Sequence, residues 1–105
     1  AVLHYLAQED VVHLDVKPSN IIMGAPARLI DLSVARPVEE ASCLDHPIGT
    51  DPYMAPEQCD PPRTGVVGPA SDVWGLGATL FEAIAGYKAF DRAARSRRVT
   101  SPATP

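Results

Sequence analysis

The sequence is poor in cysteine and in aromatic residues, and both shortages narrow the class of protein. Of 105 residues, two are cysteines, Cys43 and Cys59, and aromatic residues make up 6%. Two cysteines without a CxxC spacing build no disulfide framework, so free thiols in a cytoplasmic protein are the expectation. An apolar content of 46% is typical of a folded globular unit and excludes a wholly disordered chain.

Long apolar runs are also missing. The best stretch, from Trp74 to Gly86, is interrupted by Glu82 and is too short to span a bilayer. No signal-peptide pattern opens the chain. We therefore expect no transmembrane segment here and a cytoplasmic location, while a membrane anchor elsewhere in a longer protein stays open.

Acidic residues outnumber basic ones, but they are unevenly distributed. The net charge is −4, and all thirteen acidic residues lie within residues 1–91. Residues 92–105 carry four arginines and end in Ser-Pro-Ala-Thr-Pro. Such a tail could contact nucleic acid or anionic lipid, but its composition favours a solvated, disordered linker. We predict a folded domain at 1–91, a disordered basic tail at 92–105 and no nucleic-acid partner.

Apolar periodicity and turn residues predict several short elements and one long helix. The expected elements are a helix at 1–8, strands at 11–14, 21–23 and 28–30, an irregular stretch at 32–69 and a helix at 71–86. Ser71 is a good N-cap for that last helix, and Gly86 is a good terminator. Apolar residues, including Trp74 and Phe81, lie on nearly all sides of this helix, so we expect the helix to be buried.

A short polar constellation lies between two of the expected strands. The segment His13-Leu14-Asp15-Val16-Lys17-Pro18-Ser19-Asn20 places a carboxylate, an ammonium and an amide within six residues. Phosphoryl transfer from ATP needs these groups together: a carboxylate to orient and deprotonate a hydroxyl, a cation for the moving phosphate, and an oxygen ligand for Mg²⁺. Asp31, at the end of the next hairpin, offers a second oxygen ligand.

Four segments in order carry a resemblance to a known family. The first resembles the protein-kinase catalytic loop H-R-D-x-K-x-x-N, and Asp31-Leu32-Ser33 stands where that family has D-F-G. Ala55-Pro56-Glu57 matches A-P-E, after Gly49 to Met54, which is similar to the loop that receives the substrate peptide. Ser71 to Gly77 resembles the start of the buried F helix. The resemblance covers roughly residues 1–91. The Ala- and Pro-rich composition of the helical segments is similar to that of kinases from high-GC bacteria.

The resemblance implies a role for each matching residue. Asp15 would be the catalytic base and Lys17 the partner of the transferred phosphate, with ATP and Mg²⁺ as cofactors. Asn20 and Asp31 would bind Mg²⁺, and Ile22 would lie beneath the adenine. Thr50 would brace Asp15 and Lys17, Asp72 would hold the catalytic-loop backbone, and Glu57 would act structurally. Lys17, two residues after Asp15, is typical of serine/threonine kinases.

The sequence also departs from the family pattern. Leu14 replaces the arginine that in many kinases pairs with an activation-loop phosphate, and Leu32 and Ser33 replace Phe and Gly of D-F-G. If the resemblance holds, we hypothesise that the protein does not depend on that phosphate switch. A glycine-rich G-x-G-x-x-G loop and a V-A-I-K lysine are missing, so the N-lobe is expected to be absent from this chain.

The sequence therefore predicts an α+β fold: a partial kinase C-lobe, mainly helical, with a short β-hairpin at the catalytic loop. The leading function is phosphate transfer from Mg-ATP to Ser/Thr hydroxyls of protein substrates. The alternative is a truncated remnant or pseudokinase that acts only as a binding module. Asp15, Lys17 and Asn20 could also be plain turn residues, and His13 is expected to be structural. A Cys59–His13 thiol dyad has no local support. The sequence leaves the oligomeric state open.

Overall fold

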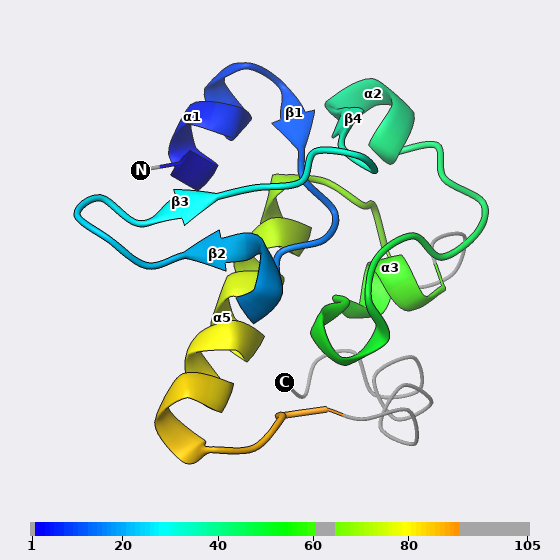
Figure 1. Cartoon of the computed structure of the whole chain (residues 1–105). Coiled ribbons are helices and arrows are strands. Elements are labelled where there is room, and N and C mark those ends of the chain that lie inside the picture. The colour runs from blue at the N-terminus through cyan, green and yellow to red at the C-terminus, as the bar shows by residue number, and fades with distance from the viewer. Residues whose placement is uncertain (1, 61–64, 91–105) are drawn as a thin grey trace.

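The computed structural model describes residues 2–60 and 65–90, in which helices predominate over four very short strands (Figure 1). Here η denotes a 3-10 helix. The elements in chain order are α1 (Val2–Gln8), β1 (Val11–Val12), η1 (Pro18–Asn20), β2 (Ile21–Ile22), β3 (Arg28–Leu29), β4 (Arg36–Pro37), α2 (Val38–Ala41), η2 (Asp51–Tyr53), α3 (Pro56–Cys59) and α5 (Pro69–Ala85).

The predicted β-hairpin is confirmed. Strands β2 and β3 pair antiparallel, with Ile21 opposite Leu29 and Ile22 opposite Arg28. The pairing continues beyond them, because the Ile30 amide donates to the Asn20 carbonyl at 2.8 Å. The hairpin therefore joins the end of the catalytic-loop segment to the residue before Asp31.

A second antiparallel pair corrects the prediction for residues 32–69. Strand β1 pairs with β4, with Val12 opposite Arg36, whereas the sequence indicated an irregular stretch there. That stretch also contains η2 and the four-residue helices α2 and α3. Elements of two to four residues are too short to leave a readable periodicity. The predicted strand at 11–14 stops at Val12, because Leu14 has a left-handed backbone with φ of 73°.

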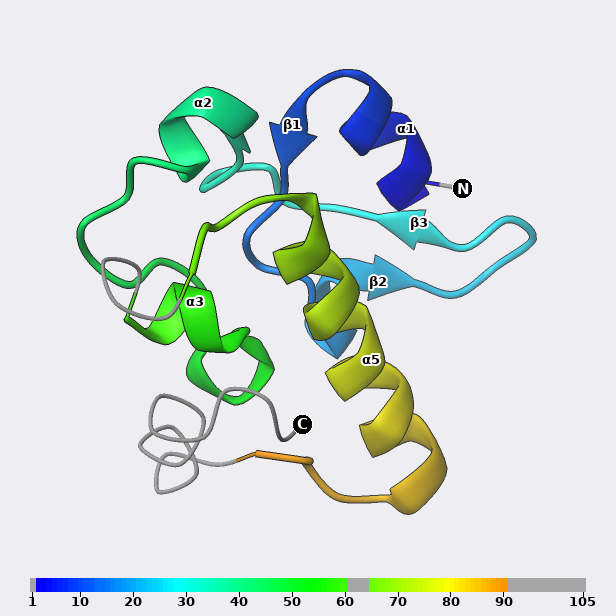
Figure 2. The same ribbon diagram turned by 180° about the vertical axis from the view of Figure 1, so that it is seen from behind.

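Helix α5 begins earlier than predicted. Gly68 is its N-cap, and Ser71 lies inside the first turn, where its hydroxyl accepts the Gly68 N–H at 3.2 Å. The terminator at Gly86 is as expected, since this residue adopts φ of 83°. In Figure 1, α5 crosses behind the β2–β3 hairpin and the segment that leads from β1 to η1, and in Figure 2, seen from the opposite side, it lies in front of them.

The core lies where β1, α2 and the catalytic-loop segment meet. Val12, Leu14, Ala41 and Val67 form a buried cluster, and Val34, Val38, Leu44 and Ile48 pack against it. Helix α5 approaches the same region closely at Gly75, where an added Cβ would lie 2.9 Å from the Val16 carbonyl oxygen. A glycine there lets the helix support the catalytic-loop backbone directly.

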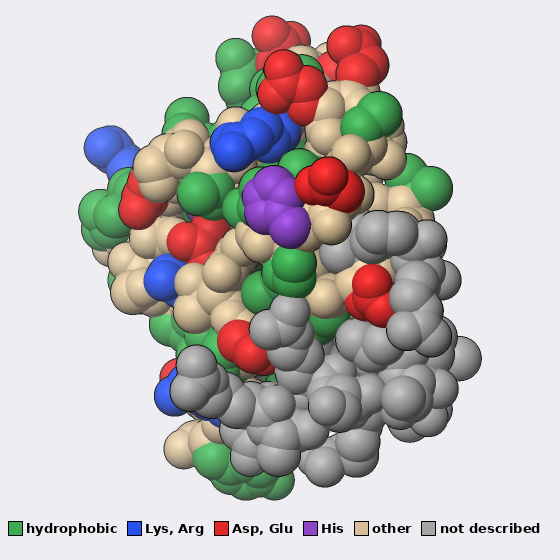
Figure 3. Space-filling view, turned by 90° about the vertical axis from the view of Figure 1, so that its right-hand side faces the viewer, with side chains coloured by type: hydrophobic (Ala, Val, Ile, Leu, Met, Phe, Trp, Pro, Cys, Tyr) green, Lys and Arg blue, Asp and Glu red, His purple; other side chains and the backbone are tan. Residues whose placement is uncertain are grey.

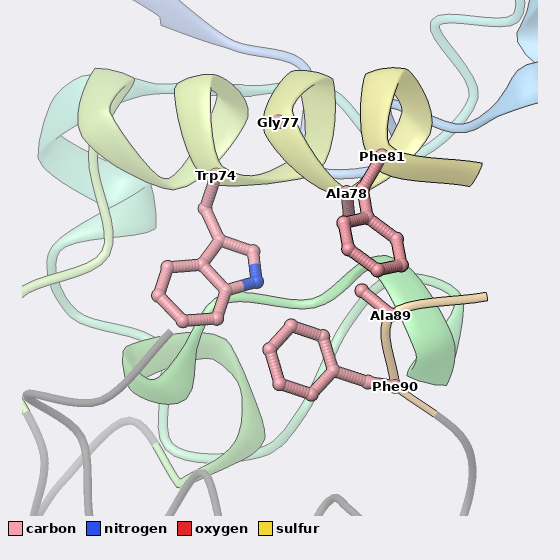
Figure 4. A pocket seen from close by; sticks show the side chains of 6 residues that line it. All are labelled: Trp74, Gly77, Ala78, Phe81, Ala89 and Phe90. Atoms are coloured by element: carbon pink, nitrogen blue, oxygen red, sulfur yellow. The ribbon is translucent and has the colours of Figure 1, made fainter. Parts of the chain in front are cut away.

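The expectation that α5 is buried all round is wrong. Val73 is 59% exposed, Leu80 53% and Ile84 87%, because no other element of the described part of the chain covers that face. Trp74 and Phe81 line an open groove of about 470 Å³ with Ala89 and Phe90 (Figure 4). Trp74 stacks on Phe90 with ring centroids 5.5 Å apart. Within the described residues, no helix combines the length and apolarity needed to cross a membrane.

Candidate active site

Asp15 lies at the centre of a chain of polar contacts. Its Oδ1 accepts a hydrogen bond from the Thr50 hydroxyl at 2.6 Å. That hydroxyl in turn accepts from Lys17 Nζ at 2.8 Å, and Lys17 Nζ also lies 3.8 Å from Asp15 Oδ2. The side chain of Asp15 is 17% exposed, so one carboxylate edge is held within the protein while the group stays reachable. Folding thus brings Thr50 to Asp15 and Lys17, which lie two positions apart in the sequence.

Asn20 faces the same carboxyl-bearing residue from η1. Its Nδ2 donates to the Asp15 backbone carbonyl at 2.9 Å and lies 3.4 Å from Asp15 Oδ2. The residue is 5% exposed. Among the hydrogen bonds of the described residues, none uses Asn20 Oδ1. The amide is therefore oriented with its nitrogen on the loop and its oxygen available as a ligand.

Asp72 supports the loop from α5. Its Oδ2 accepts the His13 backbone N–H at 2.7 Å and its Oδ1 accepts that of Leu14 at 2.9 Å. Burial raises the pKa of the Asp72 carboxyl, and the two amide donors counteract part of this rise. One side chain thereby satisfies two buried backbone donors, which holds the peptide just before Asp15.

His13 is completely buried and uses both ring nitrogens on backbone groups. Nδ1 accepts from the Asp15 amide at 3.1 Å, so Nε2 carries the proton and donates to the Ile30 carbonyl at 2.9 Å. The ring connects the catalytic-loop segment to Ile30, which follows β3 and precedes Asp31. In this environment His13 orients backbone and has no nitrogen left for acid–base chemistry.

Leu14 has a strained backbone in a buried place. Its φ of 73° is unusual for leucine and costs on the order of 1 kcal/mol. The side chain is 2% exposed and belongs to the apolar cluster with Val12 and Ala41. Leucine at this position therefore packs against the segment of residues 34–48 through apolar contact, where an arginine would bring charge.

Asp31 stands at the exposed end of the hairpin with φ of 63°. The Ser33 amide donates to its Oδ1 at 3.1 Å. Hydrogen bonds from the hydroxyl and amide of Ser33 hold the pKa of Asp31 below its ordinary value. Ser33 itself has no positive φ, so the serine in this place is accommodated without the backbone freedom of glycine.

Ile22 lies apart from the Asp15 cluster. It is 50% exposed on β2, beside Met23 at 83%, and Leu32 is 60% exposed after Asp31. Ile22 and Leu32 are thus open to solvent, whereas Met23 lines a groove with Ile21 and with α5 residues such as Thr79.

Glu57 lies behind the site and bonds to α5. Its Oε2 accepts from the Ser71 hydroxyl at 2.8 Å, so Ser71 connects α3 to the first turn of α5. Tyr53 makes a second link, donating from its hydroxyl to Glu82 Oε1 at 2.5 Å. Burial and this acidic neighbour raise the pKa of Tyr53 to about 12.

Sequence reasoning missed Gln58, which is 3% exposed. Its Nε2 donates to the Leu14 carbonyl at 3.0 Å and to the Ile48 carbonyl at 3.1 Å, and its Oε1 accepts from the Ala55 amide at 3.0 Å. A polar residue directly after Ala55-Pro56-Glu57 carries no local signal of this role, because its partners lie ten and 44 residues away.

The residues present fit a Mg²⁺ ion by their chemistry. Asn20 offers an amide oxygen and Asp31 an ionised carboxylate, and Mg²⁺ is commonly held by one or two protein oxygens together with substrate phosphates. The described residues contain no group of three or more histidine, cysteine or acidic side chains that could enclose a metal. A pair of oxygen ligands matches a metal that arrives with a phosphate.

Charge is not concentrated at the site alone. Acidic side chains gather at the top of the face seen in Figure 3, over α2, which carries Glu39 and Glu40. Neither cysteine forms a disulfide; Cys43 is exposed and Cys59 is buried. Around Asp15, by contrast, a carboxylate, the Lys17 ammonium and the Asn20 amide lie together.

The Asp15 carboxylate, the Lys17 ammonium and the Asn20 amide lie together between a β-hairpin and a supporting helix, an arrangement similar to the catalytic loop of a phosphotransferase. Comparison with known proteins makes the assignment specific. The model of the protein kinase domain matches residues 1–103. This chain belongs to the protein kinase family.

Individual relatives agree with that assignment. Over 83 residues the chain is 46% identical to the probable serine/threonine-protein kinase PkwA of Thermomonospora curvata, covering 76% of this chain and 11% of the relative. It is 39% identical to the MAP kinase kinase mkk-4 of Caenorhabditis elegans, and that match covers 80% of this chain and 23% of the relative. It is 33% identical to the serine/threonine-protein kinase nekl-2 of the same organism, and that match covers 85% of this chain and 25% of the relative.

The chain thus spans a tenth to a quarter of the length of these curated relatives. The predicted domain end at residue 91 and the tail at 92–105 fall outside the residues that the structure describes. Both stay predictions.

Proposed function

We propose that this chain carries the catalytic loop of a serine/threonine protein kinase, which transfers the γ-phosphate of ATP to Ser/Thr hydroxyls of protein substrates. The observation that carries the proposal is the contact chain Lys17–Thr50–Asp15, with bonds of 2.8 and 2.6 Å. It holds a base and a cation at one place, which phosphoryl transfer requires.

In this proposal Asp15 orients the substrate hydroxyl and takes its proton. The Thr50 hydroxyl bonds to Oδ1. The incoming hydroxyl would bond to Oδ2, which the Asn20 amide reaches only at 3.4 Å and which keeps a second lone pair. Lys17 places its positive charge beside the transferred phosphate, and Thr50 keeps the ammonium and the carboxylate in a fixed relation. Asp72 and Glu57 act behind the site, through the loop backbone and through α5 respectively.

ATP and Mg²⁺ are the proposed cofactors, with Asn20 Oδ1 and the Asp31 carboxylate as the metal ligands. When bound, Mg²⁺ supplies positive charge that offsets the charge developing on the phosphate oxygens. The apolar surface at Ile22 would receive the adenine ring. The proposed setting is the cytoplasm, with which the absence of a disulfide at Cys43 and Cys59 agrees.

Preference for Ser/Thr rests on Lys17 and on the relatives. Two of the three relatives named above are called serine/threonine-protein kinases. A lysine two residues after the base is also the serine/threonine pattern. The protein substrates therefore present an aliphatic hydroxyl to Asp15.

The test is Asp15→Asn in the full-length natural protein, with phosphate transfer from radiolabelled Mg-ATP to casein as the measurement. Asparagine keeps the shape but cannot accept a proton, so the rate should fall by about 10²-fold or more. Asp45→Asn is the matched control, because the Asp45 side chain is 88% exposed and pairs only with its neighbour His46 among the described residues.

Two results would speak against the proposal. An active wild type with equal rates for Asp15→Asn would remove Asp15 from the reaction. An inactive wild type that still binds partner proteins would favour the alternative of a binding module. A loss confined to Asp15→Asn supports catalysis.

A further inference from the structure

Gln58 is the buried side chain that ties the catalytic loop to the segment before η2. We propose that Gln58 is a positioning residue: its amide sets the peptide before Asp15 and couples it to residues 44–50. The inference rests on the proposed function for its link to turnover, but its structural part stands independently. Gln58 does not touch the reacting groups.

The first contact fixes the peptide between Leu14 and Asp15. The Leu14 carbonyl accepts from Gln58 Nε2 at 3.0 Å, while the Leu14 N–H donates to Asp72 at 2.9 Å. Leu14 is thus held on both backbone groups, in a conformation with φ of 73°. A strained residue of this kind persists only where its surroundings determine it. Because the next residue is Asp15, the direction of its side chain depends on this peptide.

The second contact reaches the segment that leads to Thr50. Gln58 Nε2 also donates to the Ile48 carbonyl at 3.1 Å. Gly49 follows with φ of 131°, and a Cβ there would lie 2.7 Å from the Leu14 carbonyl oxygen and 3.1 Å from Gln58 Nε2. Only glycine allows the two backbone segments to come this close around the amide.

The third contact fixes the amide itself. Gln58 Oε1 accepts from the Ala55 amide at 3.0 Å, which determines which way the side-chain nitrogen points. The residue is 3% exposed, so water does not compete for these bonds. In both Figure 1 and Figure 2 the loop between β1 and η1 bulges toward α3, the helix that carries Gln58.

The charge state explains why an amide serves here. Two carbonyl oxygens face Nε2, so the group must donate twice and must also accept once; a neutral amide does both. Leu14 supplies no charge for an electrostatic tether between the loop and the segment of residues 34–48. The amide of Gln58, together with the apolar cluster around Leu14, makes the connection without one.

Two variants in the full-length natural protein test the inference. Gln58→Met keeps the volume but removes all three hydrogen bonds. Gln58→Glu keeps the shape and makes the hydrogen-bonding ability depend on pH: the neutral carboxyl group can donate one bond, whereas the ionised form repels both carbonyls. Burial should raise the pKa of that new carboxyl group. Gln8→Glu on the exposed end of α1 is the matched control.

Two readouts are measured in each variant. Hydrogen exchange, followed by mass spectrometry of peptides, should rise about tenfold or more in residues 11–17 and 44–50 and stay unchanged in α1 and α5. The kcat should fall about tenfold or more, with KM for ATP changed by less than about threefold. In Gln58→Glu the kcat loss should become smaller as pH falls, whereas in Gln58→Met the loss should not depend on pH.

These readouts separate the possible failures. Unchanged exchange in both segments, or exchange that rises equally in α1 and α5, overturns the inference. Raised local exchange with normal kcat overturns the positioning of Asp15. A wild type without phosphate transfer refutes the proposed function, and exchange in the two segments then decides alone whether Gln58 ties them. The inference is supported if exchange rises only in the two segments and kcat falls in both variants. The loss of kcat must then depend on pH in Gln58→Glu and not in Gln58→Met.

Discussion

Asp72 is a buried side chain that can ionise. It is 4% exposed and accepts the amides of His13 and Leu14. Burial raises its pKa above 3.8 despite these donors. The folded state therefore binds this proton more tightly than the unfolded state. The stability contributed by Asp72 is fully present below 3.8 and is lost as pH rises through the raised pKa.

Asp72→Asn should remove that pH dependence, since asparagine does not ionise. The difference in the free energy of unfolding between wild type and variant should shrink as pH rises above 3.8. Urea denaturation of the full-length natural protein from about pH 3 to about pH 7 measures it. The comparison is Asp45→Asn, because the bond to His46 lowers the pKa of Asp45 and gives the opposite sign. A constant difference at Asp72, or one that grows with pH, would contradict the assignment.

Residue spacing was a good guide to some site residues and a poor one to others. Asp15, Lys17 and Asn20 are near neighbours in the chain, so a turn brings them together in almost any fold. The roles of Thr50 and Asp72 were predicted only from the resemblance to a family, because the residues next to them in the sequence carry no sign of a contact with the Asp15 loop. Gln58 was missed, because a buried amide and an exposed one have the same sequence signal.

The segment from β4 to η2 depends on apolar packing more than on charge. Leu14 lies among Val34, Val38, Leu44 and Ile48, so no buried cation is available at residue 14 to bind a phosphate on this segment. Ser42 is exposed after α2, and its hydroxyl donates to the Glu39 carbonyl at 2.8 Å. Phosphate control through Ser42 therefore has no receptor at Leu14.

Ser42→Ala should leave turnover of the full-length protein within about twofold of wild type, because an exposed substitution of this kind changes little. Steady-state phosphate transfer from Mg-ATP is the measurement. Mass spectrometry of the wild-type preparation shows whether Ser42 carries phosphate. A tenfold or greater loss in Ser42→Ala would mean that this segment relies on a modified serine after all.

Short elements were the ones that sequence patterns did not find. Strand β4 and helices α2 and α3 have two or four residues each, too few for a period to repeat. The hairpin β2–β3 was found because β-branched residues flank a turn rich in glycine and proline. The long helix α5 was found, but its start was misplaced, because Ser71 looks like an N-cap and serves as the partner of Gly68 and Glu57.

Exposed apolar surface characterises the described chain as a unit. Val73, Leu80 and Ile84 of α5 are more than half exposed, as are Met23 and Leu32 near the site. Apolar area left in water adds nothing to stability. Asp31, a proposed ligand of the nucleotide's Mg²⁺, is exposed, and the sequence contains no glycine-rich loop to cover the phosphates.

The isolated 105-residue chain should therefore bind Mg-ATP weakly, with a dissociation constant of about 1 mM or above, and unfold with little cooperativity. Isothermal titration calorimetry and thermal unfolding followed by circular dichroism measure the two properties. The full-length natural protein, under the same conditions, is the reference. Micromolar binding together with a sharp melting transition of the isolated chain would contradict this expectation.

The sequence by itself determined the family, the β2–β3 hairpin and the closeness of Asp15, Lys17 and Asn20, because these depend on local spacing and on ordered motifs. The resemblance implied supports at Thr50 and Asp72, but only the tertiary structure shows their contacts and adds Gln58. The contacts that bring Thr50 to Lys17, and Gln58 and Asp72 to Leu14, span 33, 44 and 58 residues. Such contacts form only when helices α3 and α5 pack behind the loop, and that packing energy has no signature in a short stretch of sequence.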